Sequence, residues 1–323
     1  MTIALDAMGG DHAPAELVAG ALAAAASGVE VVLVGDPGIL EPELDRAGGQ
    51  LPVIAAADVI GMHDEPARAL RQKPDASVSV AARLVASGDA AGFVSAGSTG
   101  AAMAAAAILI GRIPGVVRPC IASIWPTPPT PTIVLDSGAN PDVKPNHLLQ
   151  FALMGSVAAE IFLSMNEPRV GLLSNGEEEG KGRDLERTAF GLLSGSHLNF
   201  VGNVEGRDVG RDRADVIVTD GFTGNVFLKA VEGTARMVVA LTADAISHLE
   251  AGARQAVQPA LDEIRTRLDP ETYGGGHLLG VSGVVVIAHG SSRARSVANA
   301  LRMAHEGAEA DLVRRVGDRL AAG

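Results

Sequence analysis

Short apolar runs along the chain end in glycine-rich polar corners, and each corner is followed by a stretch that suits a helix. This pattern occurs in the segments 2–14, 91–102, 131–140, 168–182, 214–225 and 284–294. Plainer apolar runs lie between them, at 30–36, 52–56 and 198–204. Continuous apolar strands that alternate with helical stretches predict an α/β fold of three layers, α/β/α, in which a mainly parallel sheet is covered by helices on both faces.

The six glycine-rich corners are expected to be strand-to-helix loops. In a parallel sheet these loops gather at the carboxyl ends of the strands, where ligands bind, so all six are expected on one edge of the sheet. Glycine lets a ligand approach main-chain N–H groups closely. A helix N-terminus adds unpaired donors and the positive end of the helix dipole. The corners therefore predict a site for an anion, above all phosphate.

Three of the apolar runs end in an aspartate, namely Asp6, Asp136 and Asp220. Carboxylates repel phosphate, so their place in an anion site needs an explanation. One explanation is a divalent metal that bridges carboxylate and ligand. The other is that each aspartate accepts N–H bonds from its own loop and braces it. The bracing role is favoured, and no metal site is predicted, since the sequence has no CxxC, no HExxH and no dense histidine cluster.

Lysine is rare in this chain, and most of its few occurrences lie near the corners. The lysines are Lys73, Lys144, Lys181 and Lys229, among 26 Lys and Arg residues in all. A compact ammonium suits a point-charge contact to phosphate or to a developing oxyanion. The alternative is an arginine-biased composition in which the lysines have no special role. His289 is a further site candidate, because it directly follows an apolar run.

Composition narrows the class of partner. The 323 residues carry a formal net charge of -12 and only 3% aromatic residues, so a nucleic-acid partner is not expected. The single cysteine, Cys120, allows no internal disulfide and is expected to be a small buried hydrophobe. The beginning of the chain has no basic region of the signal-peptide kind, and the apolar run 101–110 is shorter than the roughly 20 residues of a membrane span. We therefore expect a cytoplasmic protein.

Common enzyme motifs are absent from the sequence. It contains no GxxxxGK[ST], no GxGxxG after a strand and no GxSxG. A P-loop nucleotidase, a dinucleotide dehydrogenase of the Rossmann type and an ordinary α/β-hydrolase are therefore disfavoured. No cofactor is predicted.

The motifs as a set resemble the phosphate acyltransferase family of bacterial phospholipid synthesis, PlsX. They are LDAMGGDHAP, SAGSTGA, LDSGAN, QFALMGSVAAE, GEEEGKG, TDGFTGNVFLKAVEG and the stretch from YGG at 273–275 through LLGVSGVVVIAHGSS. They cover nearly the whole chain in uniform order. The combination of TDGFTGNVxLKxxEG with DxMGGD is the most specific part of the resemblance. Ser98 and Ser174 are departures, because relatives often have Asn at those positions.

The resemblance implies an enzyme that moves a long-chain fatty acyl group from acyl carrier protein to inorganic phosphate. The acyl phosphate product would then serve a membrane acyltransferase that acylates glycerol 3-phosphate. The family also implies a fold similar to isopropylmalate dehydrogenase and phosphate acetyltransferase, a homodimer, and a cytosolic enzyme that visits the membrane as a peripheral protein. We expect one catalytic domain, residues 1–323, with a helical excursion at about 231–273.

Site roles follow from the same resemblance. Phosphate is itself nucleophilic, so no enzyme nucleophile is needed. Lys181 and Asn225 are the expected catalytic residues. Lys181 would neutralise the charge of the phosphate and the oxyanion, Asn225 would donate a hydrogen bond to one of them, and His289 would assist the leaving thiol. The glycines expected to bring backbone N–H groups to phosphate are Gly9, Gly10, Gly97, Gly100, Gly221 and Gly224.

Partner surfaces stay open at this stage. Acyl carrier protein is acidic, so docking needs a local basic patch. Arg207, Arg211, Arg213 and Arg236 are candidates, with ordinary surface arginines as the alternative. Apolar residues at helical spacing in 231–268 favour helix packing or a dimer contact, and the alternative is an exposed amphipathic hairpin that shelters acyl chains or touches lipid.

Two alternatives to the acyl-carrier-protein enzyme remain. One is a phosphate acetyl- or butyryltransferase that acts on coenzyme A thioesters. The other is a non-catalytic regulator that binds an anion or a carrier protein. The proline-rich stretch 125–132 is expected to be a stiff loop near the site entrance under any of the three.

Overall fold

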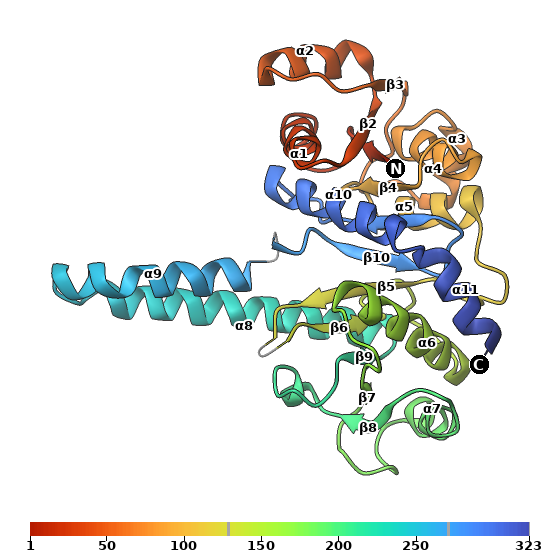
Figure 1. Cartoon of the computed structure of the whole chain (residues 1–323), viewed down its shortest axis with the longest axis vertical. Coiled ribbons are helices and arrows are strands. Elements are labelled where there is room, and N and C mark those ends of the chain that lie inside the picture. The colour runs from red at the N-terminus through yellow and green to blue at the C-terminus, as the bar shows by residue number, and fades with distance from the viewer. Residues whose placement is uncertain (128–129, 270–271, 323) are drawn as a thin grey trace.

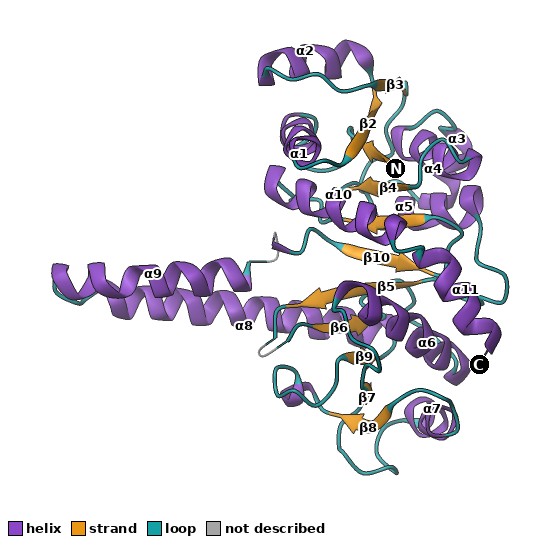
Figure 2. Cartoon of the chain, viewed as in Figure 1, coloured by secondary structure: helices purple, strands orange, loops and turns teal. Residues whose placement is uncertain are grey.

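The strands form one central sheet. The computed structural model describes residues 1–127, 130–269 and 272–322. In this part of the chain the sheet has 11 strands in the order β3-β2-β1-β4-β11-β10-β5-β6-β9-β7-β8, drawn as orange arrows in Figure 2. The strands are β1 Thr2–Asp6, β2 Glu30–Gly35, β3 Val53–Ala55, β4 Gly92–Ser95, β5 Cys120–Trp125, β6 Thr132–Leu135, β7 Val170–Leu173, β8 Phe200–Val204, β9 Val216–Val218, β10 Gly276–Leu279 and β11 Val284–Ile287.

Helices cover both faces of this sheet (Figure 1). They are α1 Ala15–Ala26, α2 Pro37–Ala47, α3 Pro66–Gln72, α4 Ser77–Ser87, α5 Thr99–Ala105, α6 Pro145–Phe162, α7 Asp184–Ser194, α8 Gly221–Ser247, α9 Ala251–Leu268, α10 Ala294–Glu309 and α11 Leu312–Ala322. A π-helical turn, Ala106–Ile110, extends α5, and a short 3₁₀ helix spans Gly206–Asp208.

Most strand residues are apolar, as expected of strands with both faces covered. In β1, Ile3 and Leu5 pack on one side with α1 and α10. Ala4, between them, points to the other side and packs with α4. The predicted α/β fold with three layers and a mainly parallel sheet is therefore confirmed.

The prediction that all six corners lie on one edge of the sheet is wrong. Strands β1, β4 and β11 are parallel to one another, and so are β6, β9 and β7. Between the two sets the pairings β11–β10, β10–β5 and β5–β6 are all antiparallel. An odd number of reversals makes the second set run opposite to the first. Three corners therefore follow strands that end at one edge, and three follow strands that end at the other.

Helices α8 and α9 form an antiparallel hairpin that projects from the body of the molecule (Figure 1). Leu261 of α9 is buried, whereas Met237, Val238 and Leu241 of α8 are exposed. The expected excursion at about 231–273 falls on this hairpin, although residues 270 and 271 lie outside the described part of the chain, as do 128 and 129 of the proline-rich stretch. Only the first turns of α8 lie in the body of the molecule, where they meet the site.

None of the helices in the described residues combines the length and the apolar character that crossing a bilayer requires.

Candidate active site

A cavity of about 260 Å³ lies over the centre of the sheet, against β5, β10 and β11. This is the place where the two oppositely directed sets of parallel strands are joined. One part of its wall is apolar and consists of Ile121, Ile124, Trp125, Pro126, Leu228, Val231, Ala235, Leu268 and Ile287. The other part carries hydroxyl, amide and ionisable groups from Thr99, Ser123, Ser137, Asn225, Lys229, Glu232, Asp269, Tyr273 and His289.

Helix α8 supplies one wall of the cavity. Asn225, Lys229 and Glu232 lie four and seven residues apart, so they share one face of the helix. Asp220 fixes where this helix begins, because it is the N-cap and its Oδ1 accepts the backbone N–H of Thr223 at 2.8 Å. The local sequence thus sets the register that turns Asn225 and Lys229 toward the cavity.

Asp136 organises the loop that faces the start of α8. Its buried carboxylate accepts backbone N–H groups of Ile121, Gly138, Ala139 and Asn140, at 2.7–3.2 Å. Burial raises the pKa of Asp136, and these hydrogen bonds oppose the rise. The carboxylate therefore holds its own loop and the start of β5, and it is not among the described residues that line the cavity.

Gly221 and Gly224 allow α8 to approach this loop closely. A Cβ at position 221 would lie 2.7 Å from the backbone nitrogen of Asn140, and one at position 224 would collide with the carbonyl oxygen of Asp136. Among the described residues, Gly221 lines a second hollow next to the cavity, together with Gly138, Asn225 and Lys229. The observed function of these two glycines is the packing of helix on loop.

Arg183 links Asp220 to the loop that carries Lys181. Its Nη2 donates to both Glu186 and Asp220. Burial would raise the pKa of Asp220, but hydrogen bonds from Thr223 and Arg183 hold it below the ordinary value. Lys181 itself is half exposed, lies 3.9 Å from Glu178, and is not among the described residues that line the cavity.

The first corner meets the second away from the cavity wall. Ser95 Oγ donates to Oδ2 of Asp6 at 2.7 Å and accepts the backbone N–H of Gly97 at 3.1 Å. Burial raises the pKa of Asp6, against hydrogen bonds that include those of Ser77 and Ser95. A Cβ on Gly9 would lie 2.9 Å from Cα of Gly97, so these two loops are packed against each other.

The predicted phosphate-binding glycines therefore separate into groups. Gly9, Gly10 and Gly97 pack together with the loop that contains Gly290, and Gly100 lies against Pro66. Of the second corner, it is Thr99 that reaches the cavity. In the described residues, the glycines on the cavity wall are instead Gly138, Gly275 and Gly276.

His289 faces the charged groups of α8. Its Nε2 lies 3.8 Å from Oε1 of Glu232, and Oε2 of Glu232 lies 3.1 Å from Nζ of Lys229. Nη2 of Arg236 is 3.4 Å from the same Oε2. Burial lowers the pKa of His289, with further lowering by Lys229 and Arg236, while Glu232 opposes them. At neutral pH His289 is therefore a neutral imidazole beside an ion-paired carboxylate.

Sequence reasoning missed Lys229, Glu232 and Gly138 as members of this site. Lys229 was noticed only as a rare lysine, and Glu232 was not considered. The signal was present: both follow Asn225 at the spacing that repeats one helix face. For Gly138 the signal was weaker, because its LDSGAN corner looked no different from the other five.

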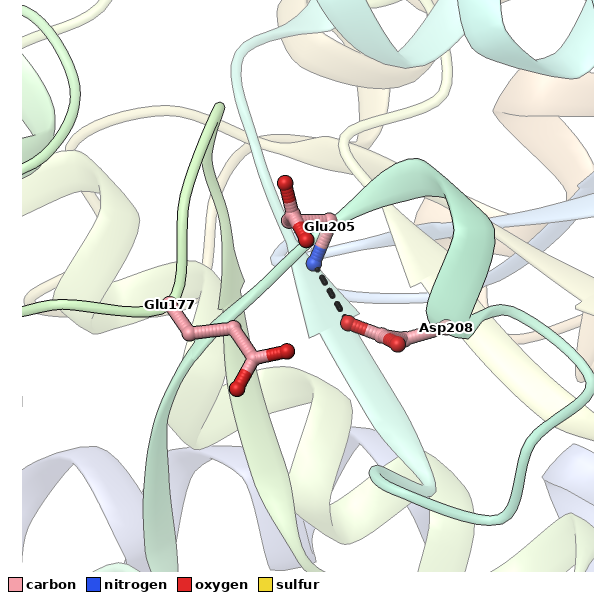
Figure 3. A group of neighbouring side chains, drawn as sticks. All are labelled: Glu177, Glu205 and Asp208. Atoms are coloured by element: carbon pink, nitrogen blue, oxygen red, sulfur yellow. Dashed lines mark hydrogen bonds between the residues drawn. The ribbon is translucent and has the colours of Figure 1, made fainter.

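An acidic cluster lies apart from the cavity, around Glu177, Glu205 and Asp208 (Figure 3). The backbone N–H of Glu205 donates to Oδ2 of Asp208 at 2.9 Å. Arg213 lies 3.1 Å from Glu177, and Arg207 contacts both glutamates. The carboxylates therefore belong to an ion-pair network, and two of the arginines considered for a basic patch are neutralised within it.

Cys120 is buried at the start of β5. Burial and the nearby charge of Asp136 raise the pKa of its thiol well above the ordinary value. A thiol with a raised pKa is a poor nucleophile at neutral pH. The burial confirms the prediction that Cys120 is a small buried hydrophobe.

A cavity with an apolar wall and a polar part that carries amide, hydroxyl and ionisable groups, built at the centre of an α/β sheet, is the usual form of an enzyme's active site. The family model described as Fatty acid synthesis protein matches residues 1–315. The chain belongs to this family.

Curated relatives are similar over almost their whole length. The phosphate acyltransferase of Heliobacterium modesticaldum is 48% identical, over 99% of this chain and 98% of that protein. The phosphate acyltransferase of Pelotomaculum thermopropionicum is 49% identical, over 96% of this chain and 92% of that protein.

Solved structures show the same fold at much lower identity. A phosphotransacetylase from Streptococcus pyogenes superposes with a TM-score of 0.65 at 19% identity, over 96% of this chain and 94% of that chain. A branched-chain phosphotransacylase from Enterococcus faecalis gives a TM-score of 0.61 at 15% identity, over 95% and 99%. These likenesses concern the fold alone.

Proposed function

We infer that this chain is a phosphate acyltransferase, an enzyme that transfers an acyl group from a thiol carrier to inorganic phosphate. The observation that carries the inference is the near-complete match to curated phosphate acyltransferases at 48–49% identity. The cavity agrees with it, because its apolar wall suits an acyl chain and its polar part offers Asn225 and Lys229 as donors to a phosphate.

The chemistry needs positioning more than an enzyme nucleophile. One oxygen of phosphate attacks the thioester carbonyl carbon, and the carbon–sulfur bond breaks with its electron pair on sulfur. The protein contributes proximity of the two reactants and stabilisation of the tetrahedral oxyanion. Burial raises the pKa of the Cys120 thiol well above its ordinary value, which agrees with a reaction in which Cys120 takes no part.

Asn225 and His289 are the proposed catalytic residues within the cavity. Asn225 donates to the oxyanion or to phosphate from the first turns of α8, and His289 serves the leaving thiol. Lys181 acts from the neighbouring loop, which Arg183 ties to the N-cap of α8. The aspartates Asp6, Asp136 and Asp220 brace their loops. Of the six predicted glycines, Gly221 and Gly224 bring α8 close to the loop beside the cavity, and Gly9, Gly10, Gly97 and Gly100 shape the packing of the first two corners.

In this proposal the acyl donor is acyl carrier protein and the acyl chain is long. The acyl phosphate goes to a membrane acyltransferase that acylates glycerol 3-phosphate, so the enzyme is cytoplasmic and visits the membrane surface. The α8–α9 hairpin, with Met237, Val238 and Leu241 exposed, suits a contact with a second copy of the chain or with lipid. The whole chain works as one catalytic unit and forms a homodimer.

Trapping the product with hydroxylamine tests the reaction. Purified protein receives palmitoyl-acyl carrier protein and inorganic phosphate, and a parallel reaction receives palmitoyl-CoA instead. Phosphate-dependent hydroxamate with loss of the acyl-protein band is the expected result. Turnover with palmitoyl-CoA alone would make the enzyme a coenzyme A-dependent transferase. No hydroxamate in either reaction, from folded protein that binds phosphate, would leave a non-catalytic binding protein.

A further inference from the structure

Glu232 is a nearly buried carboxylate that connects three cationic or basic groups at the cavity. Its side chain is 11% exposed. Oε2 faces Nζ of Lys229 at 3.1 Å and Nη2 of Arg236 at 3.4 Å, while Oε1 faces Nε2 of His289 at 3.8 Å. Lys229 and His289 both line the cavity with Glu232. One carboxylate thus contacts a lysine and a histidine that come from different parts of the fold.

Burial sets this carboxylate apart from ordinary ion pairs on helix surfaces. Glu263 of α9 pairs with Arg267 at 2.7 Å, but their side chains are 62% and 71% exposed. Exposed pairs of this kind contribute a few tenths of a kcal/mol and need no functional explanation. A carboxylate that is 11% exposed is costly unless it is paired, and beside a phosphate site it also repels the anion.

We propose that Glu232 is a positioning residue of the transfer reaction: it holds Lys229 at the cavity and stabilises the positive charge that His289 takes up during the reaction. This inference rests on the proposed phosphate acyltransferase activity. Lys229, so held, is the ammonium that meets the phosphate or the oxyanion inside the cavity.

The proton of HPO₄²⁻ provides the reason for the contact with His289. An oxygen of HPO₄²⁻ bonds to the carbonyl carbon, the carbon–sulfur bond breaks, and the electron pair leaves on sulfur. In the tautomer that carries its proton on Nε2, toward Glu232, Nδ1 of His289 is the free acceptor, and it takes the phosphate proton. The same proton then passes to the thiolate. The products are an acyl phosphate dianion and a neutral thiol, and the total charge is unchanged.

Between the two transfers His289 is an imidazolium, and its side chain is 46% exposed. Lys229 and Arg236 of α8 oppose that charge, and among the described groups that shift the pKa of His289 only Glu232 favours it. Tyr273 and Asp269 line the same cavity from the segment after α9, and Asp269 pairs with Arg295 at 3.3 Å. Removing the carboxylate therefore makes the imidazolium harder to form.

The test compares Glu232→Gln and Glu232→Asp with the matched control Glu263→Gln, which removes the same charge from the exposed pair on the same hairpin. We expect Glu232→Gln to lower kcat by on the order of 10²-fold and to raise the KM for phosphate. The limb on which activity is lost with falling pH should move to lower pH. Glu232→Asp should recover part of kcat, and Glu263→Gln should behave as the unchanged protein.

An NMR titration of His289 in the unchanged protein and in Glu232→Gln gives a second measurement, which does not depend on turnover. We expect a lower pKa for His289 in the variant. An unchanged His289 titration, or a Glu232→Gln enzyme with the kcat, phosphate KM and pH profile of the unchanged protein, would overturn the inference. The unchanged protein could form no acyl phosphate while the pKa of His289 is still lower in Glu232→Gln. The contact between Glu232 and His289 would then be supported, and the proposed function would be wrong.

Discussion

Gly138 lies directly against the side chain of Asn225. A methyl group at position 138 would be 3.0 Å from Nδ2 of Asn225, and the φ angle of Gly138 is +143°, which side-chain-bearing residues rarely adopt. Both residues line the cavity. The loop after β6 and the start of α8 are thus so close that a side chain at position 138 would press on the amide of Asn225 in a strained backbone conformation.

Gly138→Ala should therefore affect both stability and catalysis. The backbone strain is expected to lower the free energy of unfolding by about 1–3 kcal/mol. Displacement of Asn225 should lower kcat by on the order of 10–100-fold. Urea unfolding and steady-state turnover measure the two effects.

Gly28→Ala is the control for that experiment. Gly28 has a φ of +97°, but no heavy atom lies within 4 Å of the space a Cβ would fill, and it is remote in the fold from the cavity wall. The Gly28→Ala variant should be less stable than the unchanged protein and should keep its turnover while folded. Equal losses of kcat in the two variants would mean that the contact with Asn225 has no catalytic consequence.

Asn225→Ala is expected to lower kcat by about 10²–10³-fold, the usual effect of removing a donor to a developing oxyanion. The KM should change little if the contact forms mainly in the transition state. Asn166→Ala, at an exposed position, serves as the comparison. Near-full turnover of the Asn225 variant would remove this residue from the mechanism.

Lys181→Ala should lower kcat/KM for phosphate by on the order of 10–100-fold, the magnitude of one hydrogen bond to a charged group. Lys181 is half exposed and lies 3.9 Å from Glu178, so the substitution should leave the free energy of unfolding unchanged within about 0.5 kcal/mol. Lys73→Ala removes a lysine paired with Asp64 outside the cavity and should spare turnover. If Lys181→Ala also turns over normally, Lys229 is left as the lysine of the site.

The layers of the fold could be predicted from the sequence because apolar runs and helical stretches alternate with a clear period. The reversed direction of the strands in the second half of the sheet could not be predicted. Strands β5 and β10 cause the reversal, and neither leads into a glycine corner followed by a helix: β5 leads into prolines, and β10 (Gly276–Leu279) turns back into β11. Without these two strands, every remaining predicted strand looks parallel to the others.

The candidate site, too, could be predicted only in part from the sequence. His289 lies two residues after the end of β11 and Asn225 seven residues after the end of β9, at the start of α8, so a rule about strand-to-helix corners finds them. Lys229 and Glu232 enter the site through the helical repeat of α8, one and two turns further along. That repeat is visible in the sequence, but which face of α8 meets the cavity depends on the N-cap at Asp220 and on packing against the loop of Asp136.

Asp220→Ala is expected to lower the free energy of unfolding by about 1–2 kcal/mol through loss of the N-cap, with more lost because Arg183 is left without this partner. The pKa of Asp220 is lowered in the folded protein, so its contribution is complete above the unfolded value of about 3.9 and is lost as pH falls through the folded pKa. The difference between the variant and the unchanged protein should therefore shrink only below about pH 4. Urea unfolding across a pH series measures it.

Asp36→Ala gives the matching control, since Asp36 caps α2 by accepting the backbone N–H of Gly38 at 2.8 Å and is exposed. The free energy of unfolding that Asp36→Ala loses should equal the contribution of an N-cap alone. If Asp220→Ala costs no more than Asp36→Ala at pH 7, the contact with Arg183 does not stabilise the fold.

His277 makes the fold sensitive to mild acid. It is buried in β10 and stacks on Phe162 with ring centroids 4.3 Å apart. Within the described residues neither ring nitrogen has a hydrogen-bond partner, and burial lowers the pKa of His277 to about 3. The unfolded chain has a histidine pKa of about 6.5, so below that pH the unfolded state binds a proton that the folded state does not.

The free energy of unfolding should consequently fall as pH drops from about 6.5 toward 3, by up to about 1.4 kcal/mol per pH unit from this residue. His277→Leu removes the proton and two unpaired polar nitrogens, so it should be close to neutral at pH 7 and more stable than the unchanged protein by about 2 kcal/mol at pH 5. Urea unfolding at pH 7, 6 and 5 measures this difference, with His63→Gln at an exposed position as the control. If the Leu variant kept the pH dependence of the unchanged protein, His277 would bind its proton equally well in the folded and unfolded states. The prediction that burial of His277 makes the fold sensitive to acid would then be wrong.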